Sequence, residues 1–380
     1  MFKKILIVRI GNIGDVLFAT PVIRKLRKVF GNAQIDILTS PQGKVVVEKS
    51  PYLNNIFIYR KFHKIERWFK KRKLLKGLLL NKYDLCVVLE SNLEYTKFAY
   101  EISRHALRIG IDSEFGKKFL HKTEEFSRKR HAVENYLSVV SKLLNIELAG
   151  DDYSMDFFFT PLEKAADRVG DGYQDEDNGL KLLSSRSSLT GFTTCADSGN
   201  LGKEKGKGFF IVHSSCSSYL PSKSWEIDKF AEVAKYLTIH GFSVFITGAI
   251  SDCEPKLLLE KLKNEKNIHS FIGKNLYEVA SLIKQAKGVI CLDTGILHIT
   301  RALNKPLVCL FGPSDPLHTG PIGPGIYKVI RKDFRCGPCQ YFADYNKKQK
   351  EKCLDGKITP CMKAIEVEEV IKSLNSIIDG

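Results

Sequence analysis

Asp15 is the residue of this chain whose position first suggests chemistry. It ends the turn Arg9-Ile-Gly11-Asn12-Ile-Gly14, which follows an apolar run, and its two glycines allow a tight entry into a helix. A carboxylate in a first helical turn can cap backbone amides and suits the helix dipole. It can also act as a general base toward a hydroxyl group. The two roles are compatible, because a capped carboxylate is also an oriented one.

A second polar segment, residues 213–225, follows the apolar run 209–212. Its hydroxyls, Ser217 and Ser218 among them, and its single lysine, Lys223, are the groups that cradle phosphates. The charge of Lys223 suits a diphosphate leaving group. The alternative is a solvated loop with an exposed lysine, and the segment taken alone fits that alternative better.

A third candidate, Asp293-Thr294-Gly295, follows the apolar run 288–292. Thr294 is expected to be the N-cap of a helix whose N-terminus, behind Gly295, can hold a phosphate. Asp293 has no second carboxylate near it in sequence, so no catalytic metal is expected here. His298 falls one turn into this helix, where a buried structural histidine is the alternative to ligand binding.

The elements that position these residues alternate between short apolar runs and helical periodicity, which is typical of parallel α/β sheets. A long helix is expected from the Gly14 turn toward Phe30. Residues 163–207 are poor in aliphatic side chains and are expected to form a linker or mobile insertion between domains 1–162 and 208–380. Strands are expected at 5–8, 35–38, 56–59, 85–89, 209–212, 244–246, 288–292 and 307–311.

Composition limits the class of protein and its partners. The chain has 380 residues, 43% of them hydrophobic, which excludes a wholly disordered or collagen-like protein. Lys and Arg exceed Asp and Glu by 59 to 43, and the net charge of +16 favours an anionic partner. Arg9 and Asp15 interrupt the N-terminal apolar stretch, so we expect a buried strand there and no signal peptide. Scattered cysteines suit a reducing cytoplasm.

The segment 60–82 concentrates positive charge, with Trp68 and Phe69 among its basic residues. Such a segment can be a solvated helix face or can rest on an anionic membrane. We favour a membrane or glycolipid surface. Nucleic acid is not an expected partner, because no recognised binding motif accompanies the charge.

Four cysteines lie late in the chain, at Cys336, Cys339, Cys353 and Cys361. The first pair has the C-x₂-C spacing of zinc ligands, whereas the second pair does not. A structural zinc is therefore a hypothesis for this tail, and no metal is expected at the catalytic centre.

Together the motifs resemble a known family. The Arg9–Asp15 turn with Thr20-Pro21, the Lys223-Ser-Trp225 segment, the Asp293-Thr294-Gly295 segment with His298, and the Phe-Gly-Pro-Ser-Asp-Pro turn at 311–316 occur in order. This set is similar to the ADP-heptose:lipopolysaccharide heptosyltransferase family of bacteria. The resemblance spans nearly the whole chain apart from 163–207.

The resemblance implies a GT-B-type pair of Rossmann-like domains facing each other across a cleft. It implies an inverting, metal-independent glycosyltransferase without a cofactor, which moves a heptose from a nucleotide sugar, ADP-heptose, to a lipopolysaccharide-core acceptor. A cytoplasmic location, peripheral at the inner face of the inner membrane, goes with that acceptor.

The resemblance also assigns roles to residues. Asp15 matches the catalytic base, Lys223 the lysine at the donor phosphates, and Asp293-Thr294-Gly295 with His298 the donor loop. Ser217 and Ser218 belong to the expected donor side, and Asp252 or Glu254 stands where the family keeps a glutamate near the ribose. Expected on the acceptor side, or in its turn, are Arg9, Gly11, Asn12 and Gly14.

Three alternatives remain open from the sequence. The chain can use another nucleotide sugar or another glycan acceptor on the same fold, or it can be a non-catalytic nucleotide-sugar binding protein. An NAD-dependent dehydrogenase is disfavoured, because no strand is followed by G-x-G-x-x-G with an acidic residue about 20 positions later.

Overall fold

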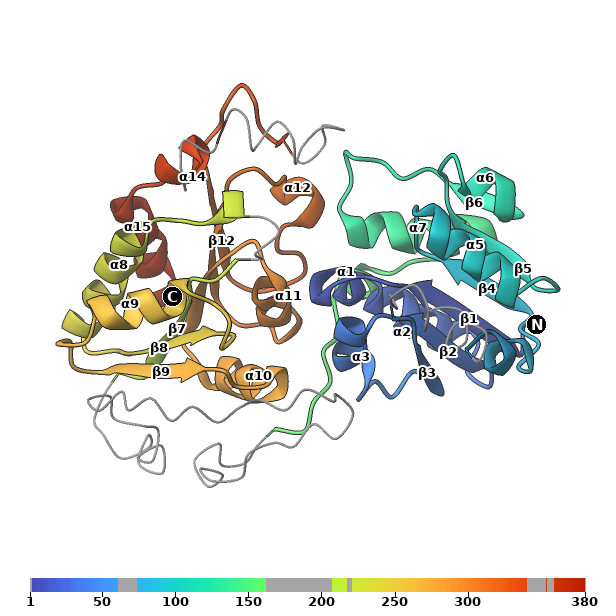
Figure 1. Ribbon diagram of the computed structural model, residues 1–380, viewed down its shortest axis with the longest axis horizontal. Coiled ribbons are helices and arrows are strands. Elements are labelled where there is room, and N and C mark those ends of the chain that lie inside the picture. Colours follow the sequence, from blue (N-terminus) through green and yellow to red (C-terminus); the bar gives the residue numbers. More distant parts are fainter. Residues whose placement is uncertain are drawn as a thin grey trace.

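The computed structural model describes residues 2–60, 74–161, 207–216, 221–339, 353 and 359–379. The helices and strands form two α/β halves that lie side by side, the N-terminal half in blue to green and the C-terminal half in yellow to red (Figure 1). Helix α1 (Ile13–Leu17) of the first half contacts helix α11 (Gly295–Ala302) of the second. The two halves therefore meet where the first and third sequence motifs lie.

The N-terminal half is built on a parallel sheet with the strand order β3-β2-β1-β4-β5-β6. Its central strands are buried on both faces, which explains their continuous apolar sequence. The strands are β1 (Lys4–Arg9), β2 (Gln34–Thr39), β3 (Asn55–Ile58), β4 (Leu85–Val88), β5 (Leu107–Ile111) and β6 (Lys122–Glu124). The helices, besides α1, are α2 (Thr20–Val29), α3 (Pro41–Val47), α5 (Leu93–Ile102), α6 (Gly116–Phe119) and α7 (Ala132–Leu144).

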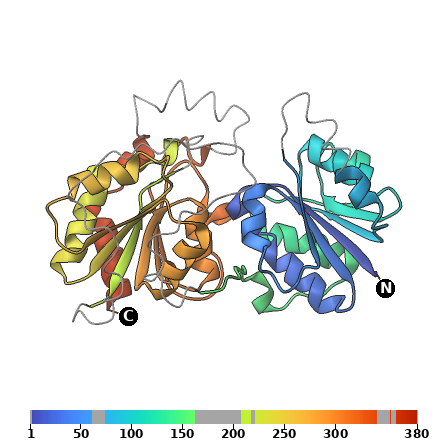
Figure 2. The same cartoon turned by 60° about the horizontal axis from the view of Figure 1, so that its bottom comes forward.

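The C-terminal half repeats this design in the order β12-β11-β10-β7-β8-β9, again with parallel pairing. Its strands are β7 (Phe209–His213), β8 (Ser243–Gly248), β9 (Ile268–Ile272), β10 (Gly288–Leu292), β11 (Leu307–Phe311) and β12 (Tyr327–Arg331). Its helices, besides α11, are α8 (Ile227–Ile239), α9 (Glu254–Lys261), α10 (Leu276–Gln285), α12 (Pro316–Thr319), α14 (Pro360–Lys363) and α15 (Val367–Ile378). Helices cover both faces of each sheet (Figure 2).

In both sheets the order in which successive strands are added reverses at an internal pair, β1 with β4 in one half and β7 with β10 in the other. At such a switch point the crossovers leave in opposite directions and open a crevice beyond the carboxyl ends of the strands, where ligands bind. The segments that follow these four strands carry Asp15, Glu90, Lys223 and Asp293. The expectation of two Rossmann-like α/β halves is thus confirmed.

The helix expected from the Gly14 turn toward Phe30 is wrong as a single element. Helix α1 ends at Leu17, and α2 starts at Thr20. Pro21 has no N–H to donate to the Leu17 carbonyl, and the Thr20 hydroxyl donates to that carbonyl instead, at 2.7 Å. A proline suits the first turn of a new helix, so the chain breaks here and restarts.

The expected linker at 163–207 and the absence of a membrane-spanning helix can be examined only in the described part of the chain. The strands of the two sheets fall on either side of residues 163–207, but residues 162–206 lie outside the described part, so the linker and the domain boundaries stay predictions. Among the described residues, none of the helices has the length and apolar character needed to span a membrane.

Candidate active site

A cavity of about 440 Å³ lies between the two halves, and we call it the central cavity. Clefts of this size hold small-molecule ligands, and binding at the meeting point of two domains is common. From the N-terminal half it is lined by Asn12, Ile13, Gly14, Asp15, Phe18 and Gln42. From the C-terminal half it is lined by His213, Ser215, Cys216, Lys223, Asp252, Asp293, Thr294, Gly295, His298 and Thr319.

A second cavity, of about 680 Å³, opens on the N-terminal half alone, and we call it the side cavity. Three residues, Asn12, Asp15 and Gln42, line both cavities. Asp15 therefore lies where the two cavities meet, a position from which one side chain can contact a molecule in each cavity. The other residues that line the side cavity are Ile10, Gly11, Ser40, Pro41, Tyr59, Arg60 and Tyr95.

The Asp15 carboxylate is held by two donors. Its Oδ2 accepts the N–H of Asn12 at 2.9 Å, and its Oδ1 accepts Nη2 of Arg9 at 2.9 Å. The side chain is still 40% exposed, so the carboxylate remains accessible from the cavities. Asp15 therefore caps the start of α1 and also faces both cavities, while its role as a general base stays a prediction.

Glycine is required at both turn positions before Asp15. A Cβ added at Gly11 would lie 2.5 Å from Cβ of Asp15, and one added at Gly14 would lie 2.7 Å from Cδ2 of His298. The close contact between Gly14 and His298 is a contact between the two halves of the chain. Phe18 packs edge-on against the same His298 ring, with 4.6 Å between the ring centroids.

Lys223 brings a positive charge into the central cavity and is paired with Asp293. Its Nζ donates to Oδ2 of Asp293 and lies 3.4 Å from the carbonyl oxygen of the same residue. Only 15% of the lysine side chain and 6% of the aspartate side chain are exposed. Both residues follow strands of the C-terminal switch point, so the sheet topology explains why the second and third motifs meet.

The N-terminus of α11 faces the same cavity without a side-chain cap. Thr294 occupies the N-cap position, as expected, but its side chain makes no capping hydrogen bond. The free amides of the first turn are an anion site when no side chain fills it. Three buried atoms in the cavity lining have no hydrogen-bond partner among the described residues: Ser215 Oγ, Thr294 Oγ1 and His298 Nδ1. Such buried polar atoms call for a polar ligand.

Two histidines of the cavity are kept neutral by burial. Burial lowers the pKa of His298 to about 4 and the pKa of His213 to about 4. His213 also shares a 3.0 Å hydrogen bond between its Nδ1 and the hydroxyl of Thr247. A neutral imidazole can donate or accept a hydrogen bond, and it leaves Lys223 as the positive group among the described residues of the lining.

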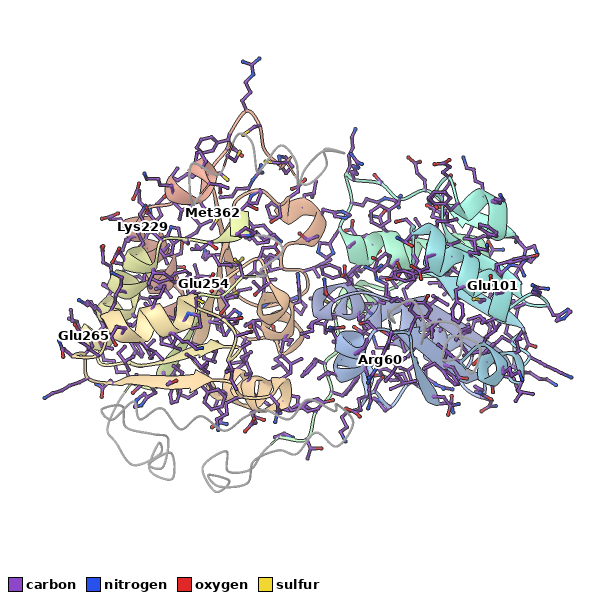
Figure 3. All side chains as sticks on the ribbon, in the orientation of Figure 1. Arg60, Glu101, Lys229, Glu254, Glu265 and Met362 are labelled. Atoms are coloured by element: carbon purple, nitrogen blue, oxygen red, sulfur yellow. The ribbon has the colours of Figure 1, made fainter. Side chains whose placement is uncertain are left out.

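The structure distinguishes the two carboxylates considered after β8. Asp252 lines the central cavity, and its Oδ2 accepts the N–H of Ala249 at 2.9 Å. Glu254 is not among the lining residues and begins helix α9, where Figure 3 labels it. Ser217 and Ser218 lie outside the described residues, so their expected donor contacts stay predictions.

The C-terminal segment 359–379, which we call the C-terminal tail, makes hydrogen bonds to the segment that carries Lys223. The buried Thr359 hydroxyl donates to the carbonyl of Ser222 at 2.9 Å. The indole Nε1 of Trp225 donates to the carbonyl of Ile365 at 3.1 Å. Figure 3 labels Lys229 of α8 and Met362 of the tail in the same half. The tail is therefore part of the support of the cavity.

The cysteine tail gives no metal centre in the described residues. Burial and the neighbouring thiols of Cys336, Cys353 and Cys361 raise the pKa of Cys339 to about 11. No group of three or more His, Cys, Asp or Glu residues in the described part of the chain has an arrangement that could hold a metal ion. The zinc hypothesis stays a prediction from sequence spacing.

Sequence reasoning missed Glu90, Gln42 and the cavity position of His213. Glu90 directly follows an apolar strand, the same signal that pointed to Asp293, so the pattern could have found it. Gln42 could not be found this way, because it lies in a short helix whose relation to Asp15 depends on the contact between α1 and α3. Arg9, expected at the acceptor or in the turn, lines neither cavity and contacts Asp15 from behind.

Comparison with known proteins identifies a family and a fold. Residues 71–350 match the family described as glycosyltransferase family 9 (heptosyltransferase). Lipopolysaccharide heptosyltransferase 2 of Escherichia coli K12 is 24% identical over 84% of this chain and 85% of its own length.

Two solved structures show the same fold over nearly the full chain. The E. coli ADP-heptose LPS heptosyltransferase II superposes with a TM-score of 0.72 at 19% identity, covering 99% of this chain and 98% of its own. An E. coli heptosyltransferase with ADP superposes with a TM-score of 0.69 at 14% identity, covering 98% of this chain and 99% of its own.

Proposed function

Since the chain belongs to glycosyltransferase family 9, the heptosyltransferases, we propose that it transfers a heptose from ADP-heptose to a lipopolysaccharide-core acceptor, with inversion at the anomeric carbon and Asp15 as the base. The observation that carries the proposal is the position of Asp15, in the lining of both cavities. In this proposal the donor occupies the central cavity and the acceptor hydroxyl enters from the side cavity.

The chemistry follows from the two charged groups of the central cavity. Asp15 takes the proton of the acceptor hydroxyl while the oxygen of that hydroxyl forms a bond to the anomeric carbon. The bond from that carbon to the diphosphate oxygen breaks, and ADP leaves with the electron pair. Lys223 and the amides at the start of α11 stabilise the charge that develops on the diphosphate, so this route requires no metal ion.

The donor side is supported by the polar atoms left open in the C-terminal half. Ser215 Oγ, Thr294 Oγ1 and His298 Nδ1 can hydrogen-bond sugar hydroxyls or phosphate oxygens. Asp252, in the same lining, is the carboxylate suited to a ribose hydroxyl. ADP as the nucleotide rests on the two E. coli heptosyltransferases named with ADP-heptose and with ADP.

The acceptor side is supported by the side cavity. Tyr95, beside the largely buried Tyr59, gives it aromatic surface for a sugar ring, and Arg60 gives it a cation for an anionic core sugar. Figure 3 labels Arg60 in the N-terminal half. A core oligosaccharide bears several negative charges, which matches the positive net charge of the chain.

We further propose that the basic segment 60–82 holds the enzyme at the cytoplasmic, inner face of the inner membrane, where a lipid-linked acceptor would lie. Residues 61–73 are outside the described part. The described end of the segment presents Lys76, Leu80 and Lys82 to solvent, with Leu80 80% exposed. Exposed apolar and basic side chains together suit the surface of an anionic bilayer.

The membrane proposal is tested with vesicles of neutral and of anionic lipid. Sedimentation with anionic vesicles is expected, with a loss at high salt and in Lys76→Glu/Lys82→Glu. The matched control is Lys261→Glu/Lys263→Glu, which reverses two exposed lysines of the C-terminal half. Binding that salt and both pairs of substitutions leave unchanged would contradict the proposal.

The transfer itself is tested with ADP-heptose and a heptose-free lipopolysaccharide core, in buffer with and without a chelator. We expect a glycosylated core whose new linkage has the anomeric configuration opposite to that of the donor, at a rate the chelator does not change. Retained configuration would contradict the inverting route, and a chelator-sensitive rate would contradict metal independence.

A different donor sugar and a non-catalytic binding protein, two of the alternatives left open by the sequence, can be distinguished with the same purified protein. A thermal-shift comparison of ADP-, UDP-, GDP- and CDP-sugars identifies the donor, because a ligand at 100 times its Kd stabilises the fold by about 2.7 kcal/mol. A larger shift with a nucleotide other than ADP would overturn the proposed donor. Tight donor binding without transfer to any core acceptor would indicate a binding protein.

A further inference from the structure

Glu90 is a buried carboxylate behind the proposed base that the transfer chemistry above does not use. It follows β4 at the switch point of the N-terminal sheet and is only 5% exposed. Its Oε1 accepts the backbone N–H of Ile10 and lies 3.3 Å from Nη1 of Arg9. A buried carboxylate destabilises a fold unless it is paired, so its presence here requires a reason.

The Arg9 guanidinium joins Glu90 to Asp15. Its Nη2 donates to Oδ1 of Asp15 at 2.9 Å, and its Nε donates to the backbone carbonyl of Asp15 at 3.2 Å. The same group donates to the Leu89 carbonyl at 3.0 Å and lies 5.1 Å from the ring centre of Tyr136. Because the planar Arg9 guanidinium is held by all these contacts, its position is fixed. The carboxylates of Glu90 and Asp15 hold it from two sides.

We propose that Glu90 is a positioning residue for the transfer reaction: its negative charge holds Arg9 in the place from which Arg9 orients the Asp15 carboxylate between the two cavities. The inference rests on the proposed role of Asp15 as the base. Neither Glu90 nor Arg9 lines either cavity, so both act through Asp15 and touch no substrate.

If Glu90 positions Asp15 through Arg9, kcat should depend on the protonation of Glu90. If Glu90 and Arg9 only stabilise the fold, kcat should not follow that protonation. Burial raises the pKa of Glu90 to about 7, and the attraction of Arg9 only partly opposes this. The other charged or titratable groups that face Glu90 are Asp15 and Tyr136. Below pH 7 Glu90 becomes neutral, and Arg9 keeps one carboxylate instead of two. We therefore expect kcat to rise with pH through about 7 in the wild type.

The decisive variant is Glu90→Gln, which keeps the shape and the acceptor for Ile10 but removes the charge. At pH 8 its kcat should be lower by about 10- to 100-fold, the effect of a small misplacement of a reacting group. Its kcat should be flat between pH 6 and pH 8, and the Kd for ADP should stay at the wild-type value. The matched control is Asp36→Asn, a buried carboxylate of β2 in the same sheet, two strands away from β4, whose oxygens accept hydrogen bonds from Tyr83 and Asn55; its pH profile should follow the wild type.

The outcomes separate the inference from the proposed function. If the wild type transfers sugar and Asp15→Asn does not, the function stands; a Glu90→Gln profile that parallels the wild type then overturns the inference alone. If Glu90→Gln fails to fold, Arg9→Lys takes its place, because lysine keeps the charge but cannot span both carboxylates, and the same loss of kcat is expected. A wild-type kcat without a rise near pH 7 also overturns the inference.

Discussion

Asp15 and Lys223 line the same cavity although they belong to opposite halves of the chain. The aspartate is held from behind by Arg9, and the lysine is paired with Asp293. Neither half contains both charges, so the arrangement exists only while the halves stay together. Contacts that join the halves include the bond between His131 Nε2 and the Gly320 carbonyl, at 3.0 Å.

Loss of the lysine charge should weaken donor binding. Lys223→Met is expected to raise the Kd for ADP by about 10- to 100-fold, because a charge-assisted hydrogen bond contributes about 1.5–3 kcal/mol. Isothermal titration at low salt measures this change. Lys235→Met is the control, since Lys235 is on the same half and pairs with Glu265 on the surface at 3.4 Å. Equal affinities for the two variants would exclude Lys223 from the phosphate site.

The tail contact should affect the donor site from a distance. Thr359→Val removes the hydroxyl that bonds the Ser222 carbonyl, and we expect ADP affinity to fall by about three- to tenfold, in line with the loss of one buried hydrogen bond. Ser373→Ala removes a comparable tail hydroxyl, which bonds the Glu369 carbonyl at 2.9 Å, and should leave affinity unchanged. If both variants bind ADP like the wild type, the tail does not position Lys223.

The sequence predicted eight of the strands described in the two sheets, since continuous apolar runs are a strong signal for buried parallel strands, but it did not predict β5, β6, β9 or β12. It also placed Asp15, Lys223 and Asp293 in turns that the sheets do bring to one cavity. It did not predict the pairing of Lys223 with Asp293, or the position of Arg9 between Asp15 and Glu90. These contacts depend on strand order, which joins β1 to β4 and β7 to β10 across long sequence distances. No local pattern encodes such neighbours.

Stability should fall in acid because of the buried histidines. The pKa values of His131, His213 and His298 are each lowered by burial from 6.5 to about 4. The unfolded chain therefore binds more protons between pH 6.5 and pH 4, and at pH 5 each histidine should reduce the unfolding free energy by about 1–2 kcal/mol relative to pH 8. Glu90 acts in the opposite sense, because its pKa is raised, so its contribution falls as pH rises from 4.5 to about 7.

Urea unfolding at pH 8 and pH 5 measures this loss. His213→Asn should show a smaller difference between the two pH values than the wild type. His240→Asn removes an exposed histidine from the same half and should keep the wild-type difference. An unfolding free energy that does not change between pH 8 and pH 5 would contradict the assignment.

The C-x₂-C spacing of Cys336 and Cys339 makes a bound zinc ion a hypothesis for the tail, although the spacing of Cys353 and Cys361 is not that of zinc ligands. Metal analysis of the purified chain should find about one zinc per chain, and removal by a chelator should lower Tm. Cys336→Ser should lose the metal, whereas Cys253→Ser, an exposed cysteine outside the tail, should retain it. Protein that is isolated without zinc and has the same Tm before and after chelation would refute this hypothesis.

The most direct test of the whole account is the turnover of Asp15→Asn compared with its affinity for the donor. Asparagine keeps the size of the side chain but cannot accept the proton of the acceptor hydroxyl. We predict that kcat falls by about 10² to 10⁴, the range of general-base catalysis, while the Kd for ADP-heptose stays at the wild-type value. A variant that turns over at the wild-type rate would contradict the account.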